Sequence, residues 1–119
     1  MRTINDGERR PSVLIVEDEA ILAIDLELAF EDAGFEVVGP ACDEDEALKL
    51  IDAHRPDFAA LDWNLRSGTS ARVAEALSRI GARFVFVTAR GGDVAYRGRD
   101  AAIFDKPADP RRLVEALAA

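Results

Sequence analysis

Asp57-Phe-Ala-Ala-Leu-Asp62-Trp-Asn-Leu-Arg-Ser-Gly68 is the stretch that decides the fold of this chain. Its residues 58–61 form a short apolar run, which is typical of a strand buried on both faces of a sheet. Asp62 follows this run, where its carboxylate is poorly solvated and its charge is unfavourable unless a cation lies beside it. Asp62 is therefore a candidate nucleophile or metal ligand. An isolated aspartate at such a point more often caps a helix or a turn, so the rest of the chain has to decide.

Length and composition indicate one small domain without disulfides. The 119 residues are enough to bury a core, and the single cysteine, Cys42, excludes an internal disulfide or a Cys-based zinc site. The net charge of -8 argues against binding to nucleic acid or anionic membranes. No apolar run approaches the roughly 20 residues of a membrane span. We expect a cytoplasmic protein with a flexible N-terminal lead-in (1–11) before one domain (12–119).

Apolar runs and helical periodicities alternate along the chain. Five apolar runs predict strands at residues 12–16, 35–38, 58–61, 83–87 and 101–104. Four amphipathic segments predict helices at residues 20–33, 44–54, 69–80 and 109–118. Residues 89–98 carry three glycines and little periodicity, so any helix there is short or irregular. The alternation predicts an α/β fold, an open parallel sheet with helices on both faces.

Polar groups follow four of the five predicted strands. Glu17 and Asp18 come after the first strand, Asp62 after the third, Thr88 after the fourth and Lys106 after the fifth. The site of an open parallel sheet lies outside the carboxyl ends of its strands. We therefore expect these five residues to converge at one edge.

Three carboxylates and one lysine at one edge leave excess negative charge. Two carboxylates about 4 Å apart repel by roughly 4 kcal/mol at an effective dielectric of 20, and Lys106 alone cannot neutralise Glu17, Asp18 and Asp62. A divalent cation with oxygen ligands, Mg²⁺ rather than zinc, relieves this repulsion; raised carboxylate pKa values are the alternative. A carboxylate nucleophile beside Mg²⁺, the Lys106 ammonium and the Thr88 hydroxyl suits formation of an aspartyl phosphate.

Four short motifs at strand ends resemble those of one family. They are Val-Glu17-Asp18-Glu, Leu-Asp62-Trp-Asn-Leu-Arg-Ser-Gly, Val-Thr88-Ala and Lys106-Pro107. With these motifs in this order, residues 12–119 resemble the response-regulator receiver domain of two-component signalling. The stretches Val-Val-Gly-Pro40 and Phe-Val-Phe-Val-Thr88 resemble alphaproteobacterial receivers related to general-stress-response regulators. The resemblance implies a flavodoxin-like, doubly wound five-stranded sheet of order 2-1-3-4-5.

The same resemblance implies a chemistry and a ligand set. Asp62 would accept a phosphoryl group from a phosphohistidine of a histidine kinase or histidine phosphotransfer protein, with Mg²⁺ as cofactor. Asp18 and Asp62 would ligate the metal directly and Glu17 more often through water. The backbone carbonyl of Asn64 would be a third protein ligand. The implied protein is a signalling switch that loses its phosphoryl group by itself, rather than an enzyme.

The chain departs from the family pattern at several positions. Ile103 stands where receivers commonly place an aromatic switch residue, and Asp105 directly precedes the lysine. Arg90 and Asn64 occupy positions that, by the resemblance, influence dephosphorylation by water. Because residues 91–98 are rich in glycine, we expect this segment to order on phosphorylation.

Three further features bear on docking and on the site. Ile21, Ile24 and Leu28 form a second apolar cluster on the first predicted helix, which either packs on the last helix or docks a kinase helix. His54 is expected to be a solvated or capping residue rather than a catalyst. Trp63 is expected to cover the site while partly exposed, and to respond to metal binding by its fluorescence.

Three functions from different classes fit these residues. The first is a phosphorylation-controlled switch, either a stand-alone receiver or one excised from a longer protein. It would be a monomer or weak dimer and would act as a phosphate shuttle, a phosphate sink or a regulator of a downstream protein. The second is a haloacid-dehalogenase-type phosphatase. In that class the nucleophile follows the first strand and a second aspartate lies two residues later, whereas here Asp62 follows the third strand and Asn64 occupies the later position. The third is a pseudo-receiver that binds partners without phosphorylation, which Ile103 and Asp105 keep open.

Overall fold

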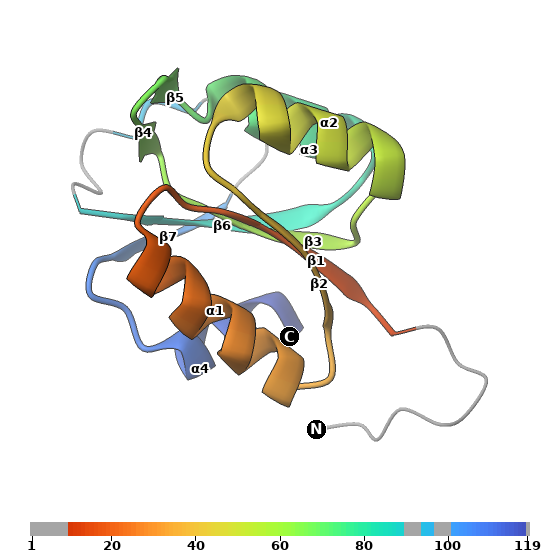
Figure 1. Cartoon of the computed structure of the whole chain (residues 1–119), viewed down its shortest axis with the longest axis vertical. Coiled ribbons are helices and arrows are strands. Elements are labelled where there is room, and N and C mark those ends of the chain that lie inside the picture. Colours follow the sequence, from red (N-terminus) through yellow and green to blue (C-terminus); the bar gives the residue numbers. More distant parts are fainter. Residues whose placement is uncertain (1–9, 90–93, 97–100, 119) are drawn as a thin grey trace.

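The fold is built on one five-stranded sheet. The computed structural model describes residues 10–89, 94–96 and 101–118 (Figure 1). The strands of this sheet are β1 (Ser12–Val16), β2 (Glu36–Ala41), β3 (Phe58–Leu61), β6 (Arg83–Thr88) and β7 (Ala102–Asp105). Neighbouring strands pair in parallel in the order β2-β1-β3-β6-β7. This order confirms the predicted 2-1-3-4-5 topology and the α/β class.

Helices cover both faces of the sheet. They are α1 (Ala20–Asp32), α2 (Glu44–His54), α3 (Ala71–Arg79) and α4 (Pro110–Ala118). Figure 1 shows α1 and α4 on one face and α2 and α3 on the other. The start of α2 is fixed locally, because the Asp43 side chain accepts a hydrogen bond from the Glu46 backbone N–H at 2.8 Å. No helix in the described part of the chain is long and apolar enough to cross a membrane.

Burial on both faces of the sheet explains the continuous apolar runs of the sequence. In β1, Leu14 and Val16 pack in the core under α2 and α3, whereas Val13 and Ile15 pack under α1 and α4. All four side chains are fully buried, and each contributes on the order of 2 kcal/mol to folding. The two cores hold the sheet rigidly and so fix its carboxyl edge, where the polar residues lie.

The second strand is longer than predicted. The prediction ended it at residue 38 because Gly39 and Pro40 follow, but β2 continues to Ala41. Pro40 is tolerated because β2 lies at the edge of the sheet, where one side of the strand has no pairing partner. Gly39 has a φ of +94°, and a Cβ there would lie 3.1 Å from the Ile15 carbonyl oxygen. The pairing with β1 shifts register at this point, so the strand bends and continues.

Other boundaries differ from the prediction by one or two residues. The loop predicted after Asp62 contains a hairpin of β4 (Asn64–Leu65) and β5 (Gly68–Thr69), and α3 begins after it. β7 begins and ends one residue later than predicted. The lead-in 1–11 and the segment 89–98 lie largely outside the described residues, and residues 94–96 belong to neither helix nor strand.

The first helix leaves one apolar cluster in solvent. Its buried face consists of Ala23, Leu26 and Phe30. The exposed fractions of the second cluster are 77% for Ile21, 52% for Ile24 and 59% for Leu28. The alternative in which this cluster packs on the last helix is therefore wrong, because α4 contacts the buried face of α1 instead.

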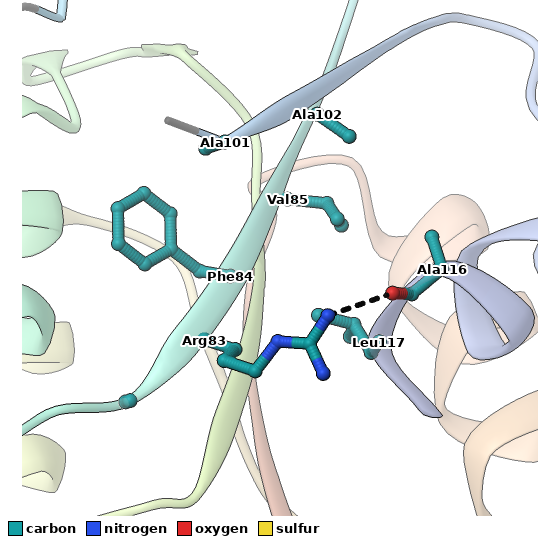
Figure 2. Close-up of a pocket in the computed structure, with 8 residues that line it drawn as sticks. Arg83, Phe84, Val85, Ala101, Ala102, Ala116 and Leu117 are labelled. Carbon is teal, nitrogen blue, oxygen red and sulfur yellow. Dashed lines mark hydrogen bonds between the residues drawn. The ribbon is translucent and has the colours of Figure 1, made fainter. Parts of the chain in front are cut away.

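A cavity of about 300 Å³ lies where β6 and β7 begin, at the edge opposite to their carboxyl ends (Figure 2). The end of α4 closes one side, and the Arg83 guanidinium donates a hydrogen bond to the Ala116 carbonyl at 3.5 Å. Arg83 is the one ionisable residue among the described residues that line the cavity, and most of the others are alanines. The cavity therefore lacks the groups for acid–base or phosphoryl chemistry.

Candidate functional site

The hydrogen-bond ladder of the sheet continues one residue past the strands and holds the polar residues in place. The Asp62 N–H donates to the Val16 carbonyl at 2.9 Å. The Lys106 N–H donates to the Thr88 carbonyl at 2.9 Å, and the Glu17 N–H makes a bond of the same length to β2. The backbones of these residues are therefore as fixed as the strands, which a site on free loops would not achieve.

The Lys106 ammonium lies at the centre of the site. Its Nζ atom lies 2.7 Å from Asp62 Oδ2 and 2.8 Å from Glu17 Oε1. A third contact joins Nζ to Glu19 Oε1 at 3.1 Å. The side chains of Glu17 and Asp62 are buried, so these ion pairs are screened little by water. The structure thus brings together three residues that the sequence predicted and one, Glu19, to which it gave no role.

Burial and hydrogen bonding set the charges of the site. Desolvation raises the pKa of the Glu17 carboxyl above its usual 4.5, although hydrogen bonds from Lys106 and from the Glu19 N–H oppose the shift. Burial alone would lower the pKa of Lys106, but hydrogen bonds to Asp62, Glu17 and Glu19 outweigh it and raise the pKa above its usual 10.5. Lys106 is therefore cationic at neutral pH, while the charged form of Glu17 would be favoured by a further cation.

Four carboxylates gather around this ammonium. Glu17, Asp18, Glu19 and Asp62, hereafter the acidic cluster, each offer an oxygen atom, and these atoms lie within 4.8 Å of one another. The single Lys106 ammonium cannot neutralise all four of these carboxylates. A set of oxygen ligands with this charge suits Mg²⁺ better than zinc.

The hairpin after Asp62 orients two of the carboxylates. Asp18 Oδ2 accepts a hydrogen bond from the Arg66 backbone N–H at 3.0 Å, and Arg66 Nε lies 4.0 Å from the same oxygen. The Asn64 N–H donates to Asp62 Oδ1 at 3.1 Å. The Asn64 side chain is exposed, and metal ligation by the Asn64 backbone carbonyl stays a prediction.

Thr88 supplies a buried hydroxyl at the end of β6. The residue is fully buried, and its Oγ1 has no hydrogen-bond partner among the described residues. An unsatisfied buried hydroxyl is unfavourable by about 1–3 kcal/mol. Such a group is explained if its acceptor arrives with a bound or covalently attached group.

Trp63 is buried, and its prediction as a partly exposed cover is wrong. Its ring meets the Phe86 ring edge to face, with the ring centroids 5.5 Å apart. The ring centroids of Phe86 and Tyr96 are in turn 5.8 Å apart. The Tyr96 hydroxyl hydrogen-bonds to Ser78 Oγ at 2.7 Å. An aromatic stack thus begins beside Asp62 and continues across β6. No local signal predicts it, because its rings come from three separate segments.

Comparison with known proteins agrees with this geometry. The family model of the response regulator receiver domain matches residues 13–118. The chain belongs to this family. Receivers of this family are signalling switches of two-component systems. The resemblance inferred from the four motifs is confirmed, and family membership favours the switch over the phosphatase.

Several relatives share most of this receiver. PdtaR, a transcriptional regulatory protein of Mycobacterium tuberculosis, is 36% identical over 110 residues, 88% of this chain and 54% of PdtaR. SdrG from Sphingomonas melonis Fr1 is 37% identical, with a TM-score of 0.79 over 92% of this chain and 94% of SdrG. A PhyR stress response regulator is 29% identical, with a TM-score of 0.74 over 95% of this chain and 45% of PhyR. Similarity to PhyR confirms the resemblance to stress-type receivers, and this chain spans about half the length of PdtaR.

On β7, isoleucine rather than an aromatic residue occupies the position three residues before Lys106. Ile103 pairs with Phe86 across β6 and β7, and 48% of its surface is exposed. The ring that covers Phe86 comes instead from Tyr96, in the connection between these strands. Any coupling between Thr88 and an aromatic ring in this receiver would therefore involve the stack rather than residue 103.

Proposed function

We propose that this receiver accepts a phosphoryl group on Asp62 from a phosphohistidine, and that its protein contacts change with that state. The supporting observation is the buried Asp62 carboxylate, which accepts a hydrogen bond from Lys106 at 2.7 Å within the acidic cluster. A carboxylate oriented by a charged donor beside a set of cation ligands has what aspartyl-phosphate formation requires. The donor in this proposal is a histidine kinase or a histidine phosphotransfer protein.

The proposed transfer forms one bond and breaks one. An Asp62 carboxylate oxygen attacks phosphorus while the phosphorus–nitrogen bond to the donor histidine breaks, and the electron pair of that bond goes to the imidazole nitrogen. Lys106 turns an N–H toward an equatorial phosphoryl oxygen, which lies next to its present acceptor on Asp62. Thr88 donates its hydroxyl hydrogen to another phosphoryl oxygen, which gives this buried group the partner that it lacks among the described residues.

Mg²⁺ is the proposed cofactor, and the described residues fit it. The acidic cluster offers only oxygen ligands, carries more negative charge than Lys106 neutralises, and contains a glutamate with a raised pKa. Asp18 and Asp62 would hold the ion directly and Glu17 through water. The backbone carbonyl of Asn64 would complete the protein ligands. Bound there, Mg²⁺ supplies neutralisation of charge on the phosphoryl oxygens.

We propose that water removes the phosphoryl group and resets the switch. Asn64, exposed directly after the Asp62 turn, is one position expected to influence this step. Arg90, the other position, lies outside the described residues. The protein, a monomer or weak dimer, then acts as a self-resetting switch in the cytoplasm, where kinases obtain their phosphoryl groups from ATP. A downstream protein would read its phosphorylation state.

Reaction with a small phosphodonor tests the proposal. Incubation with acetyl phosphate and Mg²⁺ is expected to add one phosphoryl group to the intact protein, as measured by mass spectrometry, because the donor set is preorganised. With Mg²⁺ removed by a chelator, we expect no added mass. A protein that stays unmodified while a known receiver reacts in the same tube would favour the pseudo-receiver alternative, in which partners bind without phosphorylation.

Ile21, Ile24 and Leu28, hereafter the docking face, are the proposed contact with the phosphodonor. They lie exposed along α1, whose first residue is three positions after Glu17. Exposed acidic residues flank them on α1, namely Asp25, Glu31 and Asp32. An apolar stripe with acidic flanks is complementary to a donor helix that carries apolar residues between basic ones.

Replacing Ile21 with alanine is expected to slow transfer from the phosphohistidine donor about tenfold, because a large exposed anchor residue is lost. The rate with acetyl phosphate and the thermal stability should not change, since Ile21 packs little in the free protein. Transfer from phosphorylated kinases or phosphotransfer proteins of the source organism provides the measurement. Ile103→Ala, a similar truncation of a half-exposed residue on β7, is the control. Equal transfer rates for Ile21→Ala and wild type would rule out this docking face.

A further inference from the structure

Three carboxylates hold the Lys106 ammonium, and one of them is far more exposed to solvent than the other two. An ammonium has three N–H donors, and the contacts to Asp62, Glu17 and Glu19 offer one carboxylate to each. The side chains of Lys106, Glu17 and Asp62 are nearly buried, whereas the Glu19 side chain is 60% exposed. Glu19 therefore approaches Lys106 from the solvent side of the site.

Neither of the two buried carboxylates is free to hold Lys106 throughout the proposed reaction. Asp62 is the phosphoryl acceptor, so its own charge changes during transfer. Glu17 Oε2 already accepts from both the Glu19 N–H and Lys106, each at 3.1 Å, and Glu17 is also a proposed metal ligand. Glu19 belongs to the acidic cluster but is neither the proposed phosphoryl acceptor nor one of the proposed metal ligands. Lys106 is its cationic partner in the described part of the chain.

The backbone of Glu19 is well placed to act as a fixed support. Glu19 is the N-cap of α1, and its carbonyl accepts the Ala23 N–H at 2.9 Å in the first turn of that helix. Its own N–H is held by Glu17 Oε2 at 3.1 Å. The ion pair with Lys106 therefore ties the start of α1 to the turn after β7, which lies 87 residues further along the chain.

We propose that Glu19 is a positioning residue, which holds the Lys106 ammonium beside Asp62 while Glu17 and Asp62 take part in cation binding and phosphoryl transfer. This inference rests on the proposed function and adds a positioning residue to the same site. Because Glu19 is mostly exposed, its contact with Lys106 is weak in energy and acts chiefly on orientation. The contribution of Glu19 should thus appear in the rate of transfer and not in the stability of the fold.

The variant Glu19→Gln tests this proposal by kinetics. It removes the charge and keeps the size and the backbone N–H. At saturating Mg²⁺, we expect phosphorylation by acetyl phosphate to slow about three- to fivefold. The dissociation constant for Mg²⁺, measured by calorimetry, should stay within about twofold of wild type. Glu75→Gln, the same change at an exposed position on α3, is the matched control and should react like wild type. In a Lys106→Met background, Glu19→Gln should have no further effect, because Glu19 acts through Lys106.

A second readout does not depend on phosphorylation. The chain has two lysines, Lys49 and Lys106, so ¹⁵N-lysine labelling gives two ammonium signals in an NMR spectrum. In wild type with Mg²⁺, we expect the Lys106 signal to be observable through slow exchange of its hydrogen-bonded protons. Glu19→Gln should broaden or abolish this signal, and Glu75→Gln should leave it intact. Lys49, which is exposed on α2, serves as the internal reference.

Two results would overturn the inference. If Glu19→Gln weakens Mg²⁺ binding as strongly as Asp18→Asn does, Glu19 is a metal ligand and not a support for Lys106. If the Lys106 signal and the phosphorylation rate are both those of wild type, Lys106 is held without Glu19. A wild-type protein that accepts no phosphoryl group would instead refute the proposed function, and the NMR comparison would still decide whether Glu19 holds Lys106.

Discussion

Replacing Asp62 with asparagine is expected to abolish phosphorylation, with a loss of more than about a thousandfold in rate. The amide keeps the shape of the carboxylate but is a poor nucleophile, and it also removes one of the proposed metal ligands. Intact mass after reaction with acetyl phosphate and Mg²⁺ provides the measurement. The fold should survive, because Lys106 keeps its contacts with Glu17 and Glu19.

Asp52→Asn is the matched control for this variant. Asp52 is an exposed residue of α2, so the change in net charge is the same and the site is untouched. It should be phosphorylated like wild type. An added phosphoryl group that persists in Asp62→Asn would place the acceptor on another residue and refute the assignment of Asp62.

Replacing Lys106 with methionine is expected to slow phosphorylation about a hundred- to a thousandfold at saturating Mg²⁺. This is the usual effect of removing one preorganised donor to a charged transition state. Methionine retains the length and apolar stem of lysine, so the change mainly removes the ammonium. Single-turnover rates with acetyl phosphate, compared at equal Mg²⁺ occupancy, provide the measurement.

The same variant should destabilise the metal-free protein by about 3 kcal/mol, because buried carboxylates lose their cation. Since the folded-state pKa of Lys106 is raised, its stabilising contribution is present below the ordinary lysine pKa of 10.5 and is lost only above it, as pH rises through the folded value. The deficit should therefore be constant from about pH 7 to about pH 9.

Lys49→Met is the natural control, since it removes the other lysine of the chain from an exposed position. Urea unfolding in chelator measures the stability of all three proteins. Wild-type phosphorylation in Lys106→Met would show that the lysine has no part in the transfer. An unchanged free energy of unfolding would show that the carboxylates do not need it in the folded state.

The sequence was sufficient to predict an open parallel sheet, and the order of its strands followed from the resemblance to receiver domains. The first, third and fourth strands were found at their true starting residues, because strands buried on both faces carry unbroken apolar runs. The α2 helix was predicted with its true bounds, because Asp43 caps it and Pro56 follows it. These signals are local, so they are readable without knowledge of the partner elements.

Predictions that depended on distant neighbours were less successful. Trp63 follows a charged residue in a loop, and its burial comes from Phe86 on β6. From the sequence, the apolar cluster of Ile21, Ile24 and Leu28 could either pack on the last helix or dock a kinase helix. Packing was excluded only by the structure, in which α4 contacts the other face of α1. The end of β2 was misplaced because the tolerance of Pro40 depends on β2 lying at the edge of the sheet.

The sequence by itself determined which polar residues reach the carboxyl edge, because each follows a strand and parallel strands end on the same side. It therefore predicted the meeting of Glu17, Asp62 and Lys106. Only the tertiary structure decided how the charges pair there, including the contact between Glu19 and Lys106. It also decided that the Thr88 hydroxyl is buried with no partner in the described part of the chain. The reason is that strand position follows from local hydrophobicity, whereas ion pairing, burial and pKa depend on side chains brought together from segments far apart in the chain.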